Sequence, residues 1–236
     1  NRNTFISSLN GITVHQNSDA TVFNNVFLNI NLPNNNQSQK QLNRICIHAA
    51  NEVENTLTIS TNFMTNFQRG VVIRNLQQTS FSVDNNSING TNNYTGNESN
   101  IGIDIRNYIT PGPLLAYQSD ILNNTVMHCR LGIFSENYFA ANITNNNIFF
   151  DVTEIQNSTY TGIRYGVRLN GGFGGNRVEG NYVTKAGGNP SSALSNTLIG
   201  IGANGVGNIP SWVPLNNTAA NIVGTITVTP VVTTNG

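Results

Sequence analysis

Charged residues are scarce in this chain of 236 residues. Lys, Arg, Asp and Glu together make up 9% of it, and the formal net charge is zero. Nucleic acids and anionic membranes both require a clustered basic surface, which so sparse and balanced a charge does not supply. Apolar runs are also short, and none approaches the roughly 20 residues of a membrane-spanning helix. We therefore expect no nucleic-acid partner and no membrane insertion.

Cysteine is almost absent, with Cys46 and Cys129 as the two instances. In the repeat described below they fall about three rungs apart, which is on the order of 14 Å at the spacing of stacked strands. That separation is beyond disulfide reach, so we expect two free thiols. His128 stands beside Cys129, but no second pair of ligands follows at metal-site spacing. The sequence therefore predicts no metal site, and we expect no cofactor.

Clusters of acidic residues are missing as well. The 11 carboxylates are scattered, and no two Asp residues are adjacent. Hydrolysis of glycosidic bonds requires two carboxylates at a defined separation. Asp104 and Glu136 are the one pair that the repeat could bring together for such chemistry. The scarcity of acidic clusters argues against catalysis.

A repeat is what the chain has in abundance, together with 44 asparagines. Each frame opens with a small residue and an alternating apolar strand, and closes with an apolar-x-x-Asn strand. The openings begin at Gly11, Gly70, Gly102, Gly132 and Gly166, and Arg44-Ile45-Cys46-Ile47 fills the longest gap between them. The closings are Val22 to Asn25, Ile59 to Asn62, Val83 to Asn86, Ile121 to Asn124, Ile143 to Asn146 and Val178 to Asn181.

Such a period indicates an array of units that bury their apolar edges only by stacking. Short strands that coil once per repeat predict an all-β fold, a single-stranded parallel β-helix (solenoid) of about seven rungs. We expect one domain over residues 1 to 236. We expect one inward column formed by the residues after each small residue, namely Ile12, Ile45, Val71, Ile103, Ile133 and Val167.

The first rung is expected to be covered. The chain begins at Asn1-Arg2-Asn3, inside an expected strand, so we expect it to be a fragment of a larger protein. An uncovered rung would present unpaired N–H and C=O groups. Upstream rungs or a partner chain are therefore expected to pack against it.

The repeated asparagines have a physical reason. Asn tolerates the left-handed conformation of tight corners. Its amide can also donate to the Asn of one neighbouring rung and accept from the other, which satisfies buried polar groups. We predict a structural asparagine ladder formed by Asn25, Asn62, Asn86, Asn124, Asn146 and Asn181.

The outward positions of the opening strands predict two surface columns. The fourth residue after each small residue gives His15, His48, Arg74, Arg106, Glu136 and Asn170. The second residue after it gives Thr13, Cys46, Val72, Asp104, Phe134 and Arg168. Loops that leave this face carry Tyr108, Tyr138 and Trp212.

Two interpretations of this face stay open. It is either a ladder of surface salt bridges, each of small energetic value, or a groove for a sugar or peptide built from aromatic and charged groups. The candidate ligand-binding residues of the second interpretation are Arg74, Asp104, Arg106, Glu136, Arg168, Tyr108, Tyr138 and Trp212.

On these residues the chain resembles the right-handed parallel β-helix proteins of the pectate-lyase-like superfamily, and in particular their domains of short Gly-apolar, Asn-ended repeats. The resemblance covers residues 9 to 228. It implies a right-handed coil, and a function among polysaccharide lyases and hydrolases, phage tailspikes, and bacterial surface proteins and adhesins. The Asn-rich and Thr-rich texture is similar to that of secreted proteins of Bacteroidetes-type bacteria.

Two functions follow as expectations. The first is a non-catalytic extracellular or cell-surface module, acting as a rigid spacer or as a recognition element that binds polysaccharide or another surface protein. The alternative is a carbohydrate-active enzyme, a polysaccharide lyase or glycoside hydrolase, that uses the face around Arg106 and Glu136. Because each candidate carboxylate has an Arg neighbour in the frame, we expect no catalysis and assign no catalytic residue.

Overall fold

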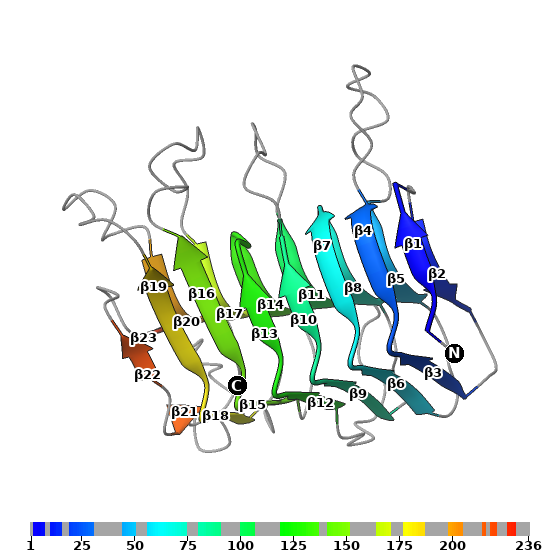
Figure 1. The fold of residues 1–236 in the computed structure, drawn as a ribbon. Helices are drawn as coiled ribbons and strands as arrows, with labels where there is room; N and C mark the ends of the chain where they lie inside the picture. The colour runs from blue at the N-terminus through cyan, green and yellow to red at the C-terminus, as the bar shows by residue number, and fades with distance from the viewer. Residues whose placement is uncertain are drawn as a thin grey trace, which may run out of the picture.

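Strands make up the regular structure of this protein, as a computed structural model shows (Figure 1). The structure describes residues 2–7, 10–15, 19–30, 44–50, 56–74, 80–90, 100–106, 119–136, 141–151, 164–170, 177–186, 198–204, 214–215, 218–220 and 226–229. The strands of these residues form three parallel sheets, here called A, B and C. Within the same residues, no helix has the length and apolar character that crossing a membrane requires.

The three sheets take every third strand of the chain. Sheet A contains, in spatial order, β1 (Thr4–Ile6), β4 (Val26–Ile30), β7 (Phe63–Phe67), β10 (Ser87–Asn89), β13 (Thr125–Met127), β16 (Asn147–Asp151), β19 (Tyr182–Ala186) and β22 (Thr218–Ala220). Sheet B contains β2 (Asn10–Val14), β5 (Ile45–Ala50), β8 (Arg69–Arg74), β11 (Ile101–Arg106), β14 (Leu131–Glu136), β17 (Arg164–Asn170), β20 (Leu198–Asn204) and β23 (Ile226–Thr229). Sheet C contains β3 (Ala20–Phe23), β6 (Thr56–Ser60), β9 (Ser80–Asp84), β12 (Ser119–Leu122), β15 (Ala141–Thr144), β18 (Arg177–Glu179) and β21 (Pro214–Leu215).

This order defines a parallel β-helix. The chain passes from sheet B to sheet C to sheet A and then enters sheet B again one coil further on, as Figure 1 shows from right to left. In the described part of the chain, successive triplets run from β2-β3-β4 to β20-β21-β22. The predicted all-β solenoid fold is therefore confirmed.

Apolar side chains fill the space between the sheets as stacked columns. The column after the glycines is paired in the order Ile12, Ile47, Val71, Ile103, Ile133 and Val167, and all members except the partly buried Ile12 are fully buried. Sheet C contributes a second column from the closing strands, formed by Val22, Ile59, Val83, Ile121, Ile143 and Val178. Both columns belong to one continuous core.

The predicted place of Ile45 in the inward column is wrong. Ile45 pairs with Asn10 and Arg69, in the column that precedes the glycines, and Ile47 takes the inward place. The frame of this coil is shifted by two residues because Cys46, and not Arg44, stands at the glycine position between Gly11 and Gly70. Elsewhere this position is closely packed: a Cβ on Gly102 would lie 2.6 Å from the Gly132 carbonyl oxygen and 2.5 Å from Val126 Cγ1.

The asparagine ladder is confirmed. From Asn25 to Asn146, each amide Nδ2 donates to the Oδ1 of the ladder Asn one coil further on, at 2.9–3.1 Å, and each backbone N–H donates to the same oxygen. The Nδ2 groups also reach back to a sheet C carbonyl of the preceding coil, as Asn124 does to Val83 O at 2.8 Å. The ladder contains Asn25, Asn62, Asn86, Asn124, Asn146 and Asn181, and Asn3 extends it at the start through a 3.1 Å bond to Asn25.

The expected left-handed conformation belongs to a different residue. The residue before each ladder Asn has φ between 54° and 64°, whereas the ladder Asn itself is not left-handed. The left-handed turn of the chain thus comes one residue before each ladder Asn. It points the side-chain amide of that Asn into the core, where the amide of the next coil contacts it. The left-handed residues of this corner are Asn24, Thr61, Asn85, Asn123, Asn145 and Gly180.

The first coil forms one edge of the described solenoid. Phe5 and Ile12 are only partly buried there, and the Phe5 ring stacks on Phe27 with centroids 4.9 Å apart. That this edge is covered by further rungs or by a partner chain stays a prediction.

Replacing a central ladder residue is expected to destabilise the solenoid. Asn124→Ala removes the acceptor of the Asn86 N–H and the donor to Val83 O, both of them buried. Unsatisfied buried groups of this kind cost about 1–3 kcal/mol each, so we expect a loss of about 3 kcal/mol in the free energy of unfolding. Urea denaturation measures it.

The matched control is Asn147→Ala, because Asn147 is exposed on the outside of sheet A. Its effect should stay within about 0.5 kcal/mol. Equal losses in the two variants would contradict a structural role of the ladder.

Candidate functional site

Most of the charged residues that the sequence predicts as ligand-binding candidates lie on the outer face of sheet B. Pairing places Arg74, Arg106, Glu136 and Asn170 in one column of neighbouring strands, as predicted. A second column on the same face runs through Thr13, His48, Val72, Asp104, Phe134 and Arg168. Since neighbouring parallel strands lie about 4.8 Å apart, side chains of adjacent coils are in reach of one another.

Asp104 is the centre of this face, and its side chain is fully buried. Arg74 forms a bidentate pair with it, with Nη2 at 2.7 Å from Oδ2 and Nη1 at 3.1 Å from Oδ1. Arg106 adds a second pair, with Nε at 2.7 Å from Oδ1 and Nη2 at 3.2 Å from Oδ2. Arg69 Nη1 lies 3.4 Å from Oδ2. Three arginines thus enclose one carboxylate, and both of its oxygens are occupied.

Glu136 lies at the edge of the same network. Its Oε2 is 3.7 Å from Arg106 Nη1, and its Oε1 accepts a hydrogen bond of 2.6 Å from the Asn170 amide. The two carboxylates therefore share Arg106, and both are held in ion pairs with arginine.

Aromatic rings and arginines alternate on the C-terminal side of Asp104. The Arg106 guanidinium lies 4.6 Å from the centre of the Phe134 ring, and the Arg168 guanidinium lies 5.5 Å from the same ring. Arg168 is also 5.0 Å from the centre of the Tyr165 ring. We call Arg106, Phe134, Arg168 and Tyr165 the cation–π row. Stacking leaves the edge of a guanidinium able to donate hydrogen bonds to an anion.

Two positions of the predicted columns are corrected by the register. His48 pairs with Thr13 and Val72, so it belongs to the Asp104 column, and Ala50 takes its predicted place beside Arg74. Cys46 leaves this face altogether and lies in the core. Both errors follow from the two-residue shift of the second frame. His15 comes directly after β2, and Tyr108, Tyr138 and Trp212 lie outside the described residues.

Sequence reasoning missed Arg69 and Tyr165. Each comes directly before a frame glycine, in a column with Ile45, Ile101 and Leu131. A frame that starts at the glycine does not count this position. The signal that could have found it is the recurrence of a large side chain before the glycine in successive frames.

The cysteines are free, as expected, and both are buried. Burial raises the pKa of Cys129 to about 12 and also raises the pKa of Cys46 well above its ordinary value. Thiols in this state are poor nucleophiles and poor metal ligands. Among the residues that the structure describes, no group of three or more His, Cys, Asp and Glu side chains is placed to hold a metal ion.

Comparison of the chain with protein-family models, with curated proteins and with solved structures gives no match.

Neutralising Asp104 is expected to destabilise the fold. Asp104→Asn leaves three arginines around a neutral amide in a buried position, and breaking a buried ion pair by removing one partner costs about 3–5 kcal/mol. We expect a loss of about 3 kcal/mol in the free energy of unfolding, measured by urea denaturation.

Asp84→Asn serves as the control, because Asp84 accepts its hydrogen bonds from Asn85 and Asn123 in an exposed setting. That change should cost less than about 1 kcal/mol. If Asp104→Asn is as mild as Asp84→Asn, the enclosure of Asp104 is not structural.

His48 predicts a pH dependence. Burial lowers the pKa of His48, and the nearby Arg74, His15 and Arg69 lower it further. The unfolded chain, whose His pKa is about 6.5, then binds the proton before the folded chain does. Stability should therefore fall as the pH drops below that value, and His48→Gln should reduce the fall. Thermal unfolding at about pH 7 and about pH 5 tests this, and an unchanged difference between the two pH values in His48→Gln would refute it.

Proposed function

We propose that this chain is a non-catalytic β-helix module of an extracellular or cell-surface protein, and that the outer face of sheet B serves as its recognition surface. The observation that carries the proposal is the enclosure of Asp104 by Arg69, Arg74 and Arg106. The carboxylate is fully buried and saturated with donors, so it is a structural group. General acid–base catalysis instead needs a group that can exchange a proton with a bound substrate.

The ligand class follows from the charges of this face. Four arginines, Arg69, Arg74, Arg106 and Arg168, stand against the two carboxylates Asp104 and Glu136. Arg168 contacts Phe134 and Tyr165, and among the described residues it has no carboxylate partner. A planar guanidinium supported by rings suits a carboxylate or sulfate group, and the rings suit the apolar face of a sugar. The surface therefore fits an acidic polysaccharide.

The rigid spacer role is compatible with this proposal. Each coil is joined to the next through three sheets and through the ladder, so the array resists bending along its whole described length. The resemblance to the pectate-lyase-like superfamily, and to secreted proteins of Bacteroidetes-type bacteria, supports an extracellular place for such a module.

Binding and turnover assays on the purified chain test the proposal. With polygalacturonate and heparin as probes, we expect weak binding that decreases as salt is added, because surface electrostatics are screened. Arg168→Gln should weaken this binding at least about fivefold, which corresponds to the loss of one charge-assisted contact. Arg2→Gln removes the same charge at an exposed site outside sheet B and should leave binding unchanged.

Turnover distinguishes this proposal from the carbohydrate-active enzyme. No reducing ends and no unsaturated products should accumulate from neutral or acidic polysaccharides. Turnover that Glu136→Gln abolishes would establish the enzyme in place of the binding module. Neither turnover nor binding would reject the recognition role and retain only the spacer role.

A further inference from the structure

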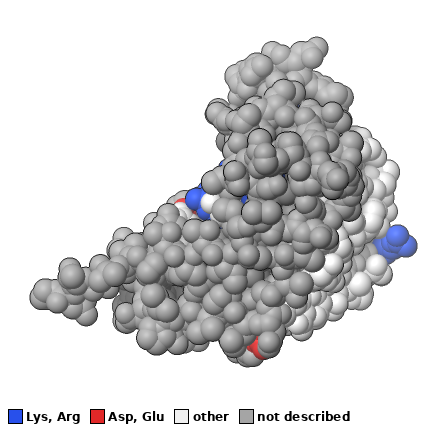
Figure 2. Space-filling model, turned by 90° about the vertical axis from the view of Figure 1, so that its left-hand side faces the viewer, with Lys and Arg blue, Asp and Glu red and all other residues white. Residues whose placement is uncertain are grey.

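The three outer faces of the solenoid differ in charge. Sheet B carries the arginine network described above. The outer side of sheet C carries acidic groups from several coils, namely Asp84, Asp120 and Glu179. The two outward columns of sheet A that are described below carry neither sign. In Figure 2 the white surface at the right belongs to this third side, with blue atoms only at its margin.

Outward positions of sheet A follow from the alternation along each strand. Phe27, Met64, Ile88, Val126, Ile148 and Val183 point into the core, so the residues on either side of each point outward. One outward column reads Val26, Phe63, Ser87, Thr125, Asn147 and Tyr182. The other reads Ile6, Leu28, Thr65, Asn89, Met127 and Phe149. Every member is uncharged.

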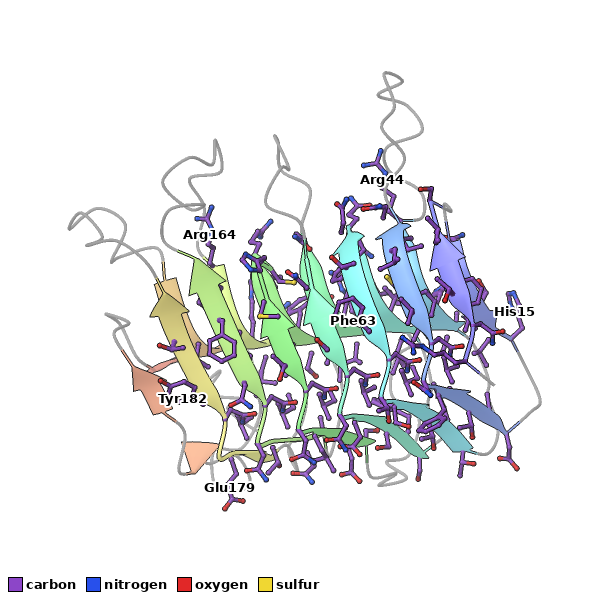
Figure 3. The ribbon with its side chains drawn as sticks, in the orientation of Figure 1. His15, Arg44, Phe63, Arg164, Glu179 and Tyr182 are labelled. Atoms are coloured by element: carbon purple, nitrogen blue, oxygen red, sulfur yellow. The ribbon has the colours of Figure 1, made fainter. Side chains whose placement is uncertain are left out.

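Large apolar side chains are exposed on this face. Among the described residues four large hydrophobic side chains are exposed, and three of them, Ile6 at 61%, Phe63 at 43% and Tyr182 at 39%, project from sheet A. Figure 3 shows Phe63 and Tyr182 on the side of the sheet that faces the viewer. Phe149 packs edge-on against Tyr182, with ring centroids 6.3 Å apart. Most of the exposed large apolar side chains of the described residues thus lie on one face, which makes that face a candidate interaction surface.

The polar residues between these rings identify the partner. Thr65 lies beside Phe63 on the same strand, and the hydroxyl and amide groups of Ser87, Asn89 and Thr125 lie between Phe63 and the Met127–Phe149–Tyr182 group. A wholly apolar partner would leave these groups without hydrogen bonds, and a charged partner would lose its hydration with no opposite charge to meet. A partner with many hydroxyl groups and apolar ring faces satisfies both requirements.

We propose that the outer face of sheet A binds a neutral polysaccharide with flat sugar-ring faces, such as cellulose or chitin. The parallel sheet presents its side chains in straight rows, and Phe63 and Tyr182 stand in one row. Four strand spacings separate them, or about 19 Å. A polymer chain laid along this row meets an aromatic ring at each end and neutral hydrogen-bonding groups between them. This surface is separate from the sheet B face and does not depend on the function proposed for it.

Depletion from solution by microcrystalline cellulose and by chitin powder tests the proposal. We expect the wild-type protein to bind one of these solids, with an affinity that about 1 M NaCl leaves unchanged because no charge takes part. The double variant Phe63→Ala, Tyr182→Ala should bind at least about tenfold more weakly, since two stacking rings are lost. The matched control is Phe23→Ala, because Phe23 is 50% exposed on sheet C.

The possible results separate clearly. Binding that depends on Phe63 and Tyr182 but not on Phe23 supports the proposal. Equal binding by the double variant, or no binding of the wild type to either solid, overturns it. A wild-type dimer that the double variant converts to a monomer, as measured by analytical ultracentrifugation, also overturns it, because the face would then be closed by a second copy of the chain. Matched denaturation curves for all variants ensure that the comparison is made between folded proteins.

Discussion

The hydrogen bond between ladder asparagines of successive coils fixes the corner at which the chain passes from sheet C to sheet A. Sheets alone do not set it, because a parallel strand can slip along its neighbour by two residues and keep its apolar face inward. The amide removes this freedom, since its donor and acceptor must both meet their partners in the buried corner between sheets C and A. The strands of sheets C and A that adjoin this corner are thereby held in one register.

The charge network on sheet B depends on the register of the strands of that sheet. Arg74 and Arg106 reach Asp104 because their strands pair without displacement, and Arg69 reaches it from the position before the glycine. A carboxylate taken out of water is costly unless charged partners satisfy it. The arginines that stabilise Asp104 also occupy both oxygens of its carboxylate.

The solenoid also separates three kinds of surface that are mixed along the chain. Every coil contributes one strand to each sheet, so residues about ten positions apart in sequence face different directions, whereas residues of successive coils share a face. A chain with no net charge can in this way carry a face rich in arginine, a face with several acidic groups and a face with two uncharged outward columns. The last of these faces depends on the complete array, because its rings come from coils that are well separated in sequence.

The sequence by itself determined the repeat, the columns of apolar residues in the closing strands and the asparagine ladder. These features are local and recur with a regular frame, so the pattern seen in one repeat can be checked against the next repeat in the sequence. It also identified Arg74, Asp104, Arg106, Glu136 and Arg168 as neighbours. Only the tertiary structure decided the register of the second coil, where Cys46 replaces the glycine and the frame carries no marker. Only the tertiary structure also revealed the enclosure of Asp104 and the cation–π row, because side-chain direction and burial depend on contacts between coils that no single frame contains.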